Sequence, residues 1–156
     1  MGRRLIGYAP GAYDLFHVGH LNLLRRARAR CDYLIAGVVS DDQLERVRGR
    51  RPVVPLAERL EIVSHLDVVD EAYAETLADK LETWAALRFD VFFKGSDWQG
   101  TPKGLELERR FAEVGVDVVY VPYTLHTSST KLRRALAVLG GEATARVDAA
   151  VERAGS

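Results

Sequence analysis

The sequence predicts a single α/β domain in which a five-stranded parallel sheet is flanked by helices. Five short apolar segments alternate with segments of helical periodicity along the 156 residues, and this alternation is typical of parallel strands joined by right-handed crossovers. The segment 31–39 is apolar almost throughout, which is typical of a strand buried on both faces. We expect this domain to span residues 1–140 and a helical tail to follow over residues 141–156.

Composition restricts the kinds of partner that the chain can have. Hydrophobic residues make up 47% and charged residues 28% of the chain, as in ordinary soluble globular proteins. The formal net charge is zero, so a phosphate site must be a local concentration of positive charge. The single cysteine, Cys31, excludes an internal disulfide and suits a reducing compartment. With no long apolar run and no signal-peptide pattern, we expect a cytoplasmic protein without membrane or nucleic-acid partners.

The first strand, expected over residues 3–8, leads into the stretch that organises the chain. A turn rich in glycine follows it, and then a helix begins near His17 and His20. Backbone N–H groups at the start of a helix are unpaired and attract phosphate, and two imidazoles placed there can donate hydrogen bonds to the same anion. Gly11 and Gly19 allow a ligand to approach the backbone closely because they lack a Cβ atom. This stretch therefore has the outline of a nucleotide phosphate site.

The second strand is followed by a short helix that we expect to end at Val47, and then by the most basic stretch of the chain. Four arginines fall within the six positions 46–51, and Pro52 and Pro55 indicate a loop that leads into a helix over residues 56–66. A planar guanidinium group binds phosphate through two hydrogen bonds, so we interpret the loop as an arm that carries arginines to phosphate. A solvated surface loop is the alternative.

The third and fourth strands, expected over residues 68–73 and 89–93, enclose a further helix. The fourth strand leads directly into the loop 94–100, and open α/β sheets place their ligand loops at such strand ends. The carboxylate of Asp97 is a natural ligand for Mg²⁺, which binds few carboxylates and completes its shell with substrate phosphates. Trp98 offers a flat surface for a base or substrate, or packs under the loop.

The fifth strand, expected over residues 116–121, leads to three consecutive hydroxyl residues at 128–130. These side chains can cap the next helix and donate hydrogen bonds to phosphate at the same time. A plain helix cap explains one hydroxyl group, but not three in a row followed by Lys131. We expect this helix to end at Gly140-Gly141 and a separate tail helix to cover residues 142–154.

Three of these stretches resemble the motifs of one family. His17-Val18-Gly19-His20, after a strand and a glycine-rich turn, resembles the HxGH signature of the cytidylyltransferase-like nucleotidyltransferases, and the run from Gly11 to Leu24 looks most like the glycerol-3-phosphate cytidylyltransferases. The loop that begins at Lys94 resembles their KGDDW-type loop, with Ser96 in place of the first acidic residue, and the segment 122–131 resembles their ISTT-type motif. The resemblance covers about residues 5–136 and implies the Rossmann-like fold of the HxGH nucleotidyltransferases.

The resemblance implies transfer of CMP from CTP to a small phosphomonoester, with release of pyrophosphate and with glycerol 3-phosphate, giving CDP-glycerol, as the leading acceptor. The residues it implies for catalysis are His17, His20, Arg48 and Ser128. The residues it implies for nucleotide binding are Ala12, Tyr13, Asp14, His17, Gly19, His20, Arg50, Lys94, Gly95, Asp97, Tyr123, Thr127, Ser128, Ser129 and Thr130. The acceptor contacts it implies are Arg48, Lys80 and Trp98. It also implies Mg²⁺ held by Asp97, further basic family positions at Arg51 and Arg59, and a homodimer.

The substrates stay open at this point. Tyr123, Leu125 and His126 stand where relatives commonly carry Arg, Glu and Gly, so the resemblance does not define the nucleobase. The segment 51–56 also resembles the ADP-heptose-forming relatives, so ATP with a sugar phosphate is an alternative, as are phosphocholine, phosphoethanolamine and phosphonate acceptors. A nucleotide-binding module without catalysis is a further alternative, and the joint presence of two histidines, an arginine loop and a hydroxyl run argues against it.

Overall fold

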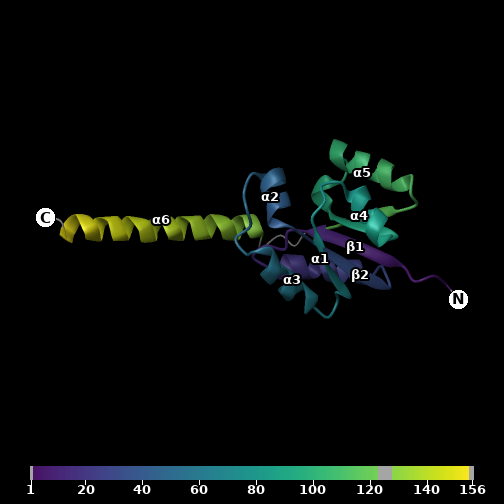
Figure 1. Cartoon of the computed structure of the whole chain (residues 1–156), viewed down its shortest axis with the longest axis horizontal. Helices are drawn as coiled ribbons and strands as arrows, with labels where there is room; N and C mark the ends of the chain where they lie inside the picture. Colours follow the sequence, from purple (N-terminus) through teal and green to yellow (C-terminus); the bar gives the residue numbers. More distant parts are fainter. Residues whose placement is uncertain (1, 123–127, 155–156) are drawn as a thin grey trace.

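A five-stranded parallel sheet forms the centre of the protein (Figure 1). In the computed structural model the described backbone covers residues 2–122 and 128–154, and side chains are described as far as residue 141. The strands lie in the order β3-β2-β1-β4-β5, and each pair of neighbours is parallel. Their bounds are β1 (Ile6–Gly11), β2 (Tyr33–Val39), β3 (Glu71–Glu75), β4 (Val91–Gly95) and β5 (Asp117–Val121). The predicted fold class is confirmed.

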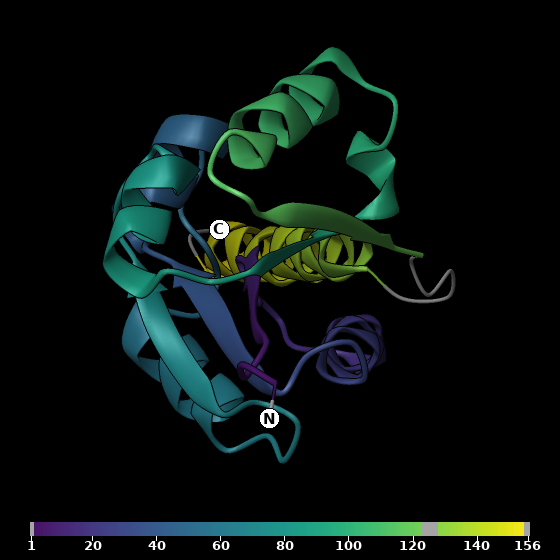
Figure 2. The same ribbon diagram turned by 90° about the vertical axis from the view of Figure 1, so that its right-hand side faces the viewer.

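Helices cover both faces of this sheet (Figure 2). The described helices are α1 (Val18–Arg28), α2 (Asp41–Arg48), α3 (Leu56–Ser64), α4 (Lys80–Leu87), the 3-10 helix η1 (Ser96–Trp98), α5 (Pro102–Ala112) and α6 (Ser129–Ala154). One face carries α1 and α3, whose Leu24 and Val63 are fully buried. The other face carries α4 and α5, whose Trp84 and Phe111 pack around Tyr8. An apolar layer therefore packs on each face of the sheet, and loops lie at its carboxyl edge.

The strands β1, β3 and β4 each lie a few residues further along the chain than predicted. Strand β1 runs to Gly11 because its pairing with β2 continues to that residue. Its pairing with β4 is confined to Gly7 and Tyr8, so beyond Tyr8 the side of β1 that faces β4 makes no strand-to-strand hydrogen bonds. Pro10 lacks an N–H and is tolerated there for this reason. In the same way β4 extends past its predicted end and includes Lys94.

Helix α2 is longer than predicted and shortens the arginine loop. It ends at Arg48, and Gly49 closes it in the left-handed conformation with a φ of 73° while its N–H donates to the carbonyl of Glu45. Glycine adopts this conformation without steric cost. Arg46 and Arg48 are therefore helical rather than part of the loop, and the loop proper starts at Gly49.

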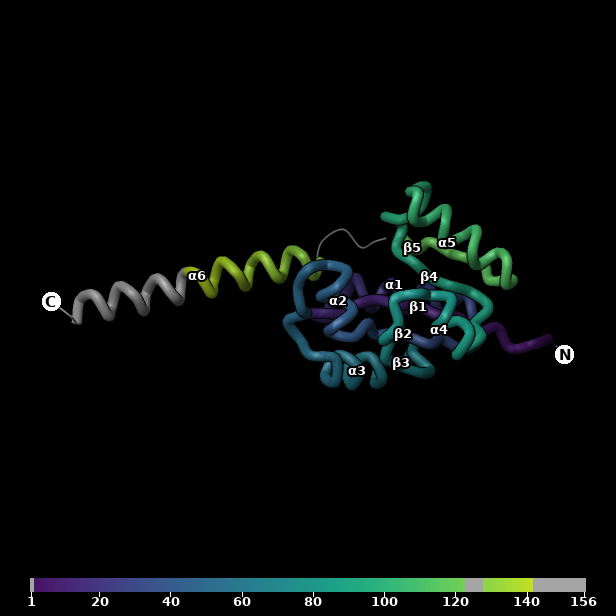
Figure 3. Tube along the Cα trace, turned by 45° about the horizontal axis from the view of Figure 1, so that its top comes forward, coloured from purple at the N-terminus to yellow at the C-terminus, as the bar shows by residue number. Residues whose placement is uncertain are grey.

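Helix α6 is a single helix, and the prediction that Gly140-Gly141 ends a helix is wrong. It runs without a break from Ser129 to Ala154 (Figure 1). Its first part, as far as residue 141, extends away from the sheet in Figure 3. A glycine in a helix interior costs about 1 kcal/mol relative to alanine, which weakens the helix but does not end it. The predicted boundary between residues 140 and 141 stays a prediction and falls inside this helix. Within the described residues, no helix combines the length and apolar character needed to cross a membrane.

Candidate functional site

The predicted site residues gather at the carboxyl edge of the sheet. Because the strands are parallel, their carboxyl ends meet at one edge. The chain passes from β1 to β2 and β3 on one side, and β4 and β5 lie on the other side of β1. In open α/β sheets, ligands bind at such a switch point, beyond the carboxyl ends of the strands. The turn after β1 and the 3-10 helix after β4 therefore flank the expected position of a ligand.

His17 and His20 cap helix α1. Nδ1 of His17 accepts a hydrogen bond from the N–H of Gly19 at 3.0 Å, and Nδ1 of His20 accepts one from the N–H of His17 at 3.2 Å. This reciprocal capping box satisfies two backbone donors at the start of the helix. The two imidazole rings lie with their centroids 4.0 Å apart. Gly19, predicted as a nucleotide contact, donates its N–H to His17 in this structure.

These caps determine which nitrogen of each imidazole carries the proton. A neutral imidazole has one N–H, and since Nδ1 accepts a hydrogen bond in both rings, the proton lies on Nε2. Burial lowers the pKa of His17. Burial is the main effect that lowers the pKa of His20, to about 4. The neighbouring His17 and Arg48 also lower this pKa, whereas Asp14 raises it. At neutral pH both rings are uncharged, and each has an Nε2–H donor.

Asp14 is buried and holds the arginine loop in place. Its carboxylate oxygens accept hydrogen bonds from the backbone N–H groups of Val53 and Val54, both at 2.9 Å. Its carbonyl oxygen accepts a hydrogen bond from Oγ of Ser129 at 2.6 Å. The turn after β1, the arginine loop and the start of α6 therefore meet at Asp14, and these contacts favour an orienting role over proton transfer.

Arg59 is fully buried beneath the site. Its guanidinium group donates hydrogen bonds to the carbonyl oxygens of Val54, Ala12 and Val39 and to the carboxylate of Asp41, at 2.6 to 2.8 Å. A buried charge requires such partners, because it has lost its hydration. Arg59 thus joins the ends of β1 and β2 to the arginine loop and α2, as a structural residue.

Ala12 and Tyr13 border the site with their backbones, while both side chains are buried. The hydroxyl of Tyr13 donates a hydrogen bond to the carbonyl of Ala9 at 2.8 Å, and burial raises the pKa of this phenol. The nucleotide contacts predicted for Ala12 and Tyr13 would therefore come from the main chain.

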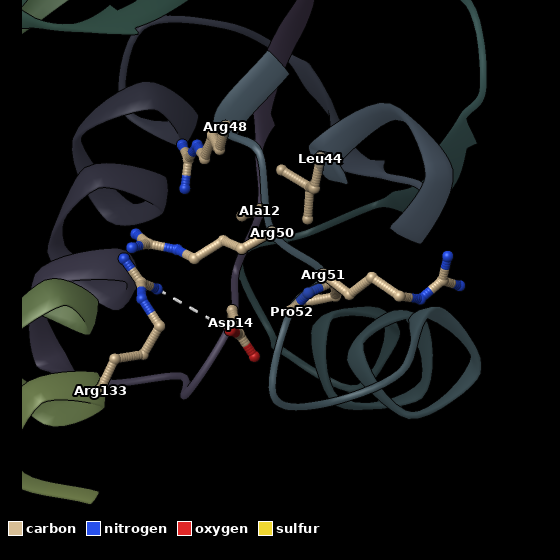
Figure 4. Close-up of a pocket in the computed structure, with 8 residues that line it drawn as sticks. All are labelled: Ala12, Asp14, Leu44, Arg48, Arg50, Arg51, Pro52 and Arg133. Carbon is tan, nitrogen blue, oxygen red and sulfur yellow. Dashed lines mark ion pairs between the residues drawn. The ribbon is translucent and has the colours of Figure 1, made fainter. Parts of the chain in front are cut away.

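Four arginines line one pocket together with Asp14 (Figure 4), and the guanidinium group of one of them, Arg51, points elsewhere. Arg48 comes from the end of α2, Arg50 from the arginine loop and Arg133 from α6. The guanidinium groups of Arg50 and Arg133 point toward the same space in Figure 4. The structure thus brings two predicted phosphate-binding residues, Arg48 and Arg50, together and adds a third guanidinium group.

Arg51 has a different environment from its neighbour Arg50. Its side chain extends away from the other arginines in Figure 4 and pairs with Asp42 and Glu45 on α2 at 3.0 and 2.9 Å. These partners are exposed, and they tie the loop to α2. Of the two adjacent arginines, only Arg50 directs its charge into the pocket.

Glu75 is a buried carboxylate at the carboxyl end of β3. It accepts a hydrogen bond from the hydroxyl of Tyr8 at 2.6 Å and forms an ion pair with Lys80. Burial and the carboxylate of Glu75 both raise the pKa of Tyr8. Lys80, a predicted acceptor contact, is therefore held at the edge of the sheet by an acidic partner.

Lys94 lies over the ring of Trp98, with Nζ 4.2 Å from the ring centroid. Burial lowers the pKa of Lys94 to about 8, and the nearby charges of Lys80 and Arg48 act in the same direction, while Asp97 opposes them. Lys94 lies in β4 one residue before its end, and Lys80 opens α4 and pairs with Glu75 at the end of β3. Lys94, Lys80 and Arg48 thus form a basic region at the carboxyl edge.

The 3-10 helix η1 carries the rest of this loop. Gly95 is buried at the end of β4, Asp97 is exposed, and Trp98 also borders a groove along α5. Within the ranges 2–122 and 128–141, no group of three or more His, Cys, Asp or Glu side chains is arranged to hold a metal ion. A single carboxylate fits Mg²⁺ when substrate phosphates supply other ligands, so Asp97 suits an ion that arrives with a nucleotide.

The three hydroxyl residues at the start of α6 have separate partners. Oγ of Ser128 accepts a hydrogen bond from a backbone N–H in the first turn at 3.1 Å, as a helix cap does. Oγ of Ser129 lies 3.4 Å from Nε2 of His20. Oγ1 of Thr130 accepts a hydrogen bond from Arg133 at 3.2 Å. The hydroxyl run is therefore next to both the histidines and the arginine pocket.

Some predicted positions lie outside the described residues. These are Tyr123 and Thr127, predicted as nucleotide contacts, and the family departures Leu125 and His126.

Arg133 and Glu75 lie at the site but belong to none of the sequence motifs described above. Arg133 lies one helical turn beyond Thr130, so helical spacing from the hydroxyl run is a signal that points to it. Glu75 has no such signal, because its partner Tyr8 is 67 positions away in the sequence.

Comparisons with known proteins find a matching family model and similar proteins. The model of the cytidylyltransferase-like family matches residues 8–135. The bifunctional protein HldE of Hyphomonas neptunium is 32% identical over 128 residues, which are 81% of this chain and 26% of that protein. HldE of Acidiphilium cryptum is 39% identical over 94 residues, which are 60% of this chain and 19% of that protein. The chain thus spans about a quarter or less of the length of these relatives.

Solved structures show the same architecture. A lipopolysaccharide core biosynthesis protein from Thermoplasma volcanium superposes with a TM-score of 0.67 and 26% identity, over 80% of this chain and 100% of that chain. A pantoate-beta-alanine ligase from Francisella tularensis superposes with a TM-score of 0.56 and 15% identity, over 76% of this chain and 59% of that chain, and shows the fold alone.

Proposed function

The chain belongs to the cytidylyltransferase-like family, and on that premise we propose that it transfers a nucleotidyl group from a nucleoside triphosphate to a small phosphorylated acceptor. A phosphate oxygen of the acceptor attacks the α-phosphorus, the bond from the α-phosphorus to the bridging oxygen breaks, and pyrophosphate leaves. The nucleophile is already anionic near neutral pH, so no strong base is needed. Alignment and stabilisation of the transferred charge then supply the catalysis.

The observation that carries this proposal is the pair of Nε2–H donors on His17 and His20. Both rings are neutral and fixed by the helix start, so they donate hydrogen bonds and are poor proton acceptors. Donors fixed in advance stabilise charge that develops on phosphate oxygens without reorganising. Such a pair suits displacement at a phosphate better than chemistry that needs a general base.

The other residues take roles that match their positions. We assign Arg48 to the acceptor phosphate, and Arg50 with the hydroxyls of Ser128 and Thr130 to the triphosphate. Guanidinium groups suit phosphate because they donate two parallel hydrogen bonds. Lys94 and Lys80 add positive charge at the carboxyl edge.

Asp97 is the carboxylate that we assign to Mg²⁺. The ion would neutralise charge on the triphosphate oxygens while it is bound. The exposed position of Asp97 leaves room for the water and phosphate ligands that this ion keeps.

A sugar phosphate is the acceptor that the observations favour. The superposable structure from T. volcanium is described as a lipopolysaccharide core biosynthesis protein, and such cores are built from sugars. The segment 51–56 also resembles the ADP-heptose-forming relatives. ATP and CTP are both candidate donors.

Glycerol 3-phosphate is the second candidate acceptor. The observation in its favour is the loop from Lys94 to Trp98, which resembles the KGDDW-type loop of the glycerol-3-phosphate enzymes. Its departure at Ser96 removes one of the two acidic residues of that loop.

Pyrophosphate release in the presence of Mg²⁺ tests both candidates. CTP and ATP are each combined with heptose phosphates, other sugar phosphates and glycerol 3-phosphate, and the nucleotidylated product is identified by its mass. Release that depends on a sugar phosphate supports the first proposal, and release with glycerol 3-phosphate alone supports the second. Absence of release with every pair overturns the proposed activity.

The mass of the protein in solution tests the predicted homodimer.

A further inference from the structure

Glu75 places a carboxylate beside the apolar cluster on one face of the sheet. It is 1% exposed, and its partner Tyr8 belongs to that cluster. A buried ion pair is weak evidence for stabilisation, because well-packed apolar side chains in its place are often as stable or more stable. The position of Glu75 is therefore better explained by a function than by the stability of the fold.

Two further residues are adapted to hold this carboxylate. Tyr8 is fully buried, its ring stacks on Phe89, and its hydroxyl reaches from β1 to Glu75 on β3 at 2.6 Å. Gly37 on the intervening strand β2 makes room for this hydroxyl, because a Cβ atom there would lie 2.1 Å from the hydroxyl oxygen. Phenylalanine would pack as well in the place of Tyr8, and glycine weakens a strand interior. What both residues accomplish together is to fix one carboxylate oxygen of Glu75.

The other carboxylate oxygen of Glu75 holds Lys80. Oε2 forms the ion pair with Nζ of Lys80, while Oε1 accepts the hydrogen bond from Tyr8. The side chain of Lys80 is 29% exposed and that of Glu75 only 1%, so an incoming anion can reach the lysine but not the carboxylate. An ammonium group has three N–H donors, and the ion pair leaves donors for such an anion.

Lys94 lies on the same face of the sheet as this ion pair. Phe92 packs with Tyr8, and Lys94 follows Phe92 by two positions in β4, so both side chains lie on one face. The pairing of β1 with β4 stops at Tyr8, which leaves the two strands without shared hydrogen bonds beyond that point. Lys80 and Lys94 therefore lie on one face at the carboxyl edge, where a ligand is expected.

We infer that Glu75 is a positioning residue: held by Tyr8, it fixes the ammonium group of Lys80 in place for the phosphate of the acceptor. The identity of this anion rests on the proposed function. A lysine side chain has several rotatable bonds and loses conformational entropy when a ligand immobilises it, and a lysine that is already fixed avoids this loss on binding. A lysine–glutamate ion pair has a comparable use in protein kinases, where it must be in place for phosphoryl transfer.

The charge of Glu75 has an opposing effect, because it weakens the attraction between Lys80 and an anion. We expect the positional effect to be larger. Lys94 and Arg48 supply attraction that does not depend on Lys80, whereas an unpaired Lys80 is free to turn toward solvent. The two effects predict opposite changes in acceptor affinity when Glu75 loses its charge.

Titration of a phosphomonoester into the full chain tests the inference. The nucleotide site is first saturated with the α,β-methylene analogue of ATP or CTP, which cannot transfer its nucleotidyl group, and calorimetry then measures binding of glycerol 3-phosphate and of a heptose phosphate. We expect Glu75→Gln to weaken binding of the phosphomonoester roughly tenfold and to change the affinity for the analogue less than about twofold. The matched control is Glu71→Gln, which removes the exposed carboxylate at the other end of β3, where it pairs with the hydroxyl of Tyr33. This control should leave both affinities nearly unchanged.

Two further variants separate position from charge and from folding. Tyr8→Phe keeps both charges of the ion pair but releases Glu75, so we expect it also to weaken phosphomonoester binding, by about threefold or more. Since Glu75 acts through Lys80, the double variant Glu75→Gln/Lys80→Gln should bind no more weakly than Lys80→Gln alone. Thermal melts check that each variant is folded. A purely structural role of Glu75 would instead lower the melting temperature and weaken both ligands together.

Several results would overturn the inference. These are unchanged or tighter phosphomonoester binding in Glu75→Gln, an equal loss in Glu71→Gln, and losses that add in the double variant. Failure of both phosphomonoesters to bind the unchanged protein would also overturn it.

The same variants distinguish this inference from the proposed function. Phosphomonoester binding that depends on Glu75, without transfer to any acceptor, overturns the proposed function and leaves the positioning role intact. Transfer that proceeds in Glu75→Gln with an unchanged KM for the acceptor overturns the positioning role and leaves the proposed function intact.

Discussion

Nε2 of His20 lies 3.4 Å from Oγ of Ser129, although the two residues are 109 positions apart in the sequence. Since Nε2 carries the proton, His20 donates to Ser129, and Ser129 in turn donates to the carbonyl of Asp14. The start of α1 and the start of α6 are thus joined by one chain of hydrogen bonds. This chain of hydrogen bonds fixes both side chains at the carboxyl edge of the sheet, where the phosphate is expected.

Replacement of His20 should reduce nucleotidyl transfer without unfolding the protein. We expect His20→Ala to lower turnover about 10²-fold or more, because it removes a donor aimed at transition-state charge. Steady-state kinetics measure the loss, and thermal melts check the fold. The control is His65→Ala, which removes an exposed histidine at the end of α3. Near-normal turnover in His20→Ala would contradict the role of this pair.

Stability should decrease in acid because of His20. Burial lowers the pKa of His20 to about 4, whereas the unfolded chain protonates near 6.5, so the unfolded state binds more protons between these values. The stabilising contribution is therefore complete above about pH 6.5 and is lost as the pH falls toward about 4, by up to about 3 kcal/mol. Urea unfolding across this range measures it. His20→Gln should flatten the dependence, and an unchanged slope in that variant would assign the effect to other groups.

Lys94 should make substrate binding sensitive to alkaline pH. Burial lowers its pKa to about 8, so the ammonium group is charged below that pH and neutral above it. We expect the KM of the anionic substrates to rise as the pH passes about 8. Arginine keeps its charge at this pH, so Lys94→Arg should remove the rise in KM near pH 8. The control is Lys103→Arg, which is also next to Trp98 and should leave this inflection unchanged. An inflection that persists in Lys94→Arg would exclude Lys94 as its source.

Arg59 should stabilise the fold far more than Arg51. We expect Arg59→Met to lower the free energy of unfolding by about 3 to 5 kcal/mol, because it leaves buried carbonyl oxygens and the carboxylate of Asp41 without their hydrogen-bond donor. Arg51→Met removes only exposed ion pairs and should leave the denaturation midpoint nearly unchanged. Denaturant titration compares the two variants. Similar midpoints would show that the buried hydrogen bonds of Arg59 contribute little.

Local pattern was sufficient to predict much of the fold and part of the site. Alternating apolar segments predict the parallel sheet, and the start of α1 at His17 and His20 follows from the turn that precedes it. The ends of elements were less predictable. Gly49 ends α2 in a left-handed cap, whereas Gly140-Gly141 remains inside α6, and nothing in the local sequence distinguishes these outcomes.

What the sequence by itself determined is the set of elements, the HxGH motif and the order of the three motifs, because periodicity and turn chemistry act over a few residues. Only the tertiary structure decided which side chains meet. It places Arg133 against Asp14, buries Arg59 among carbonyl oxygens and turns Arg51 away to α2. These arginines are alike in the sequence, and their environments differ because burial and charge depend on segments that are distant along the chain.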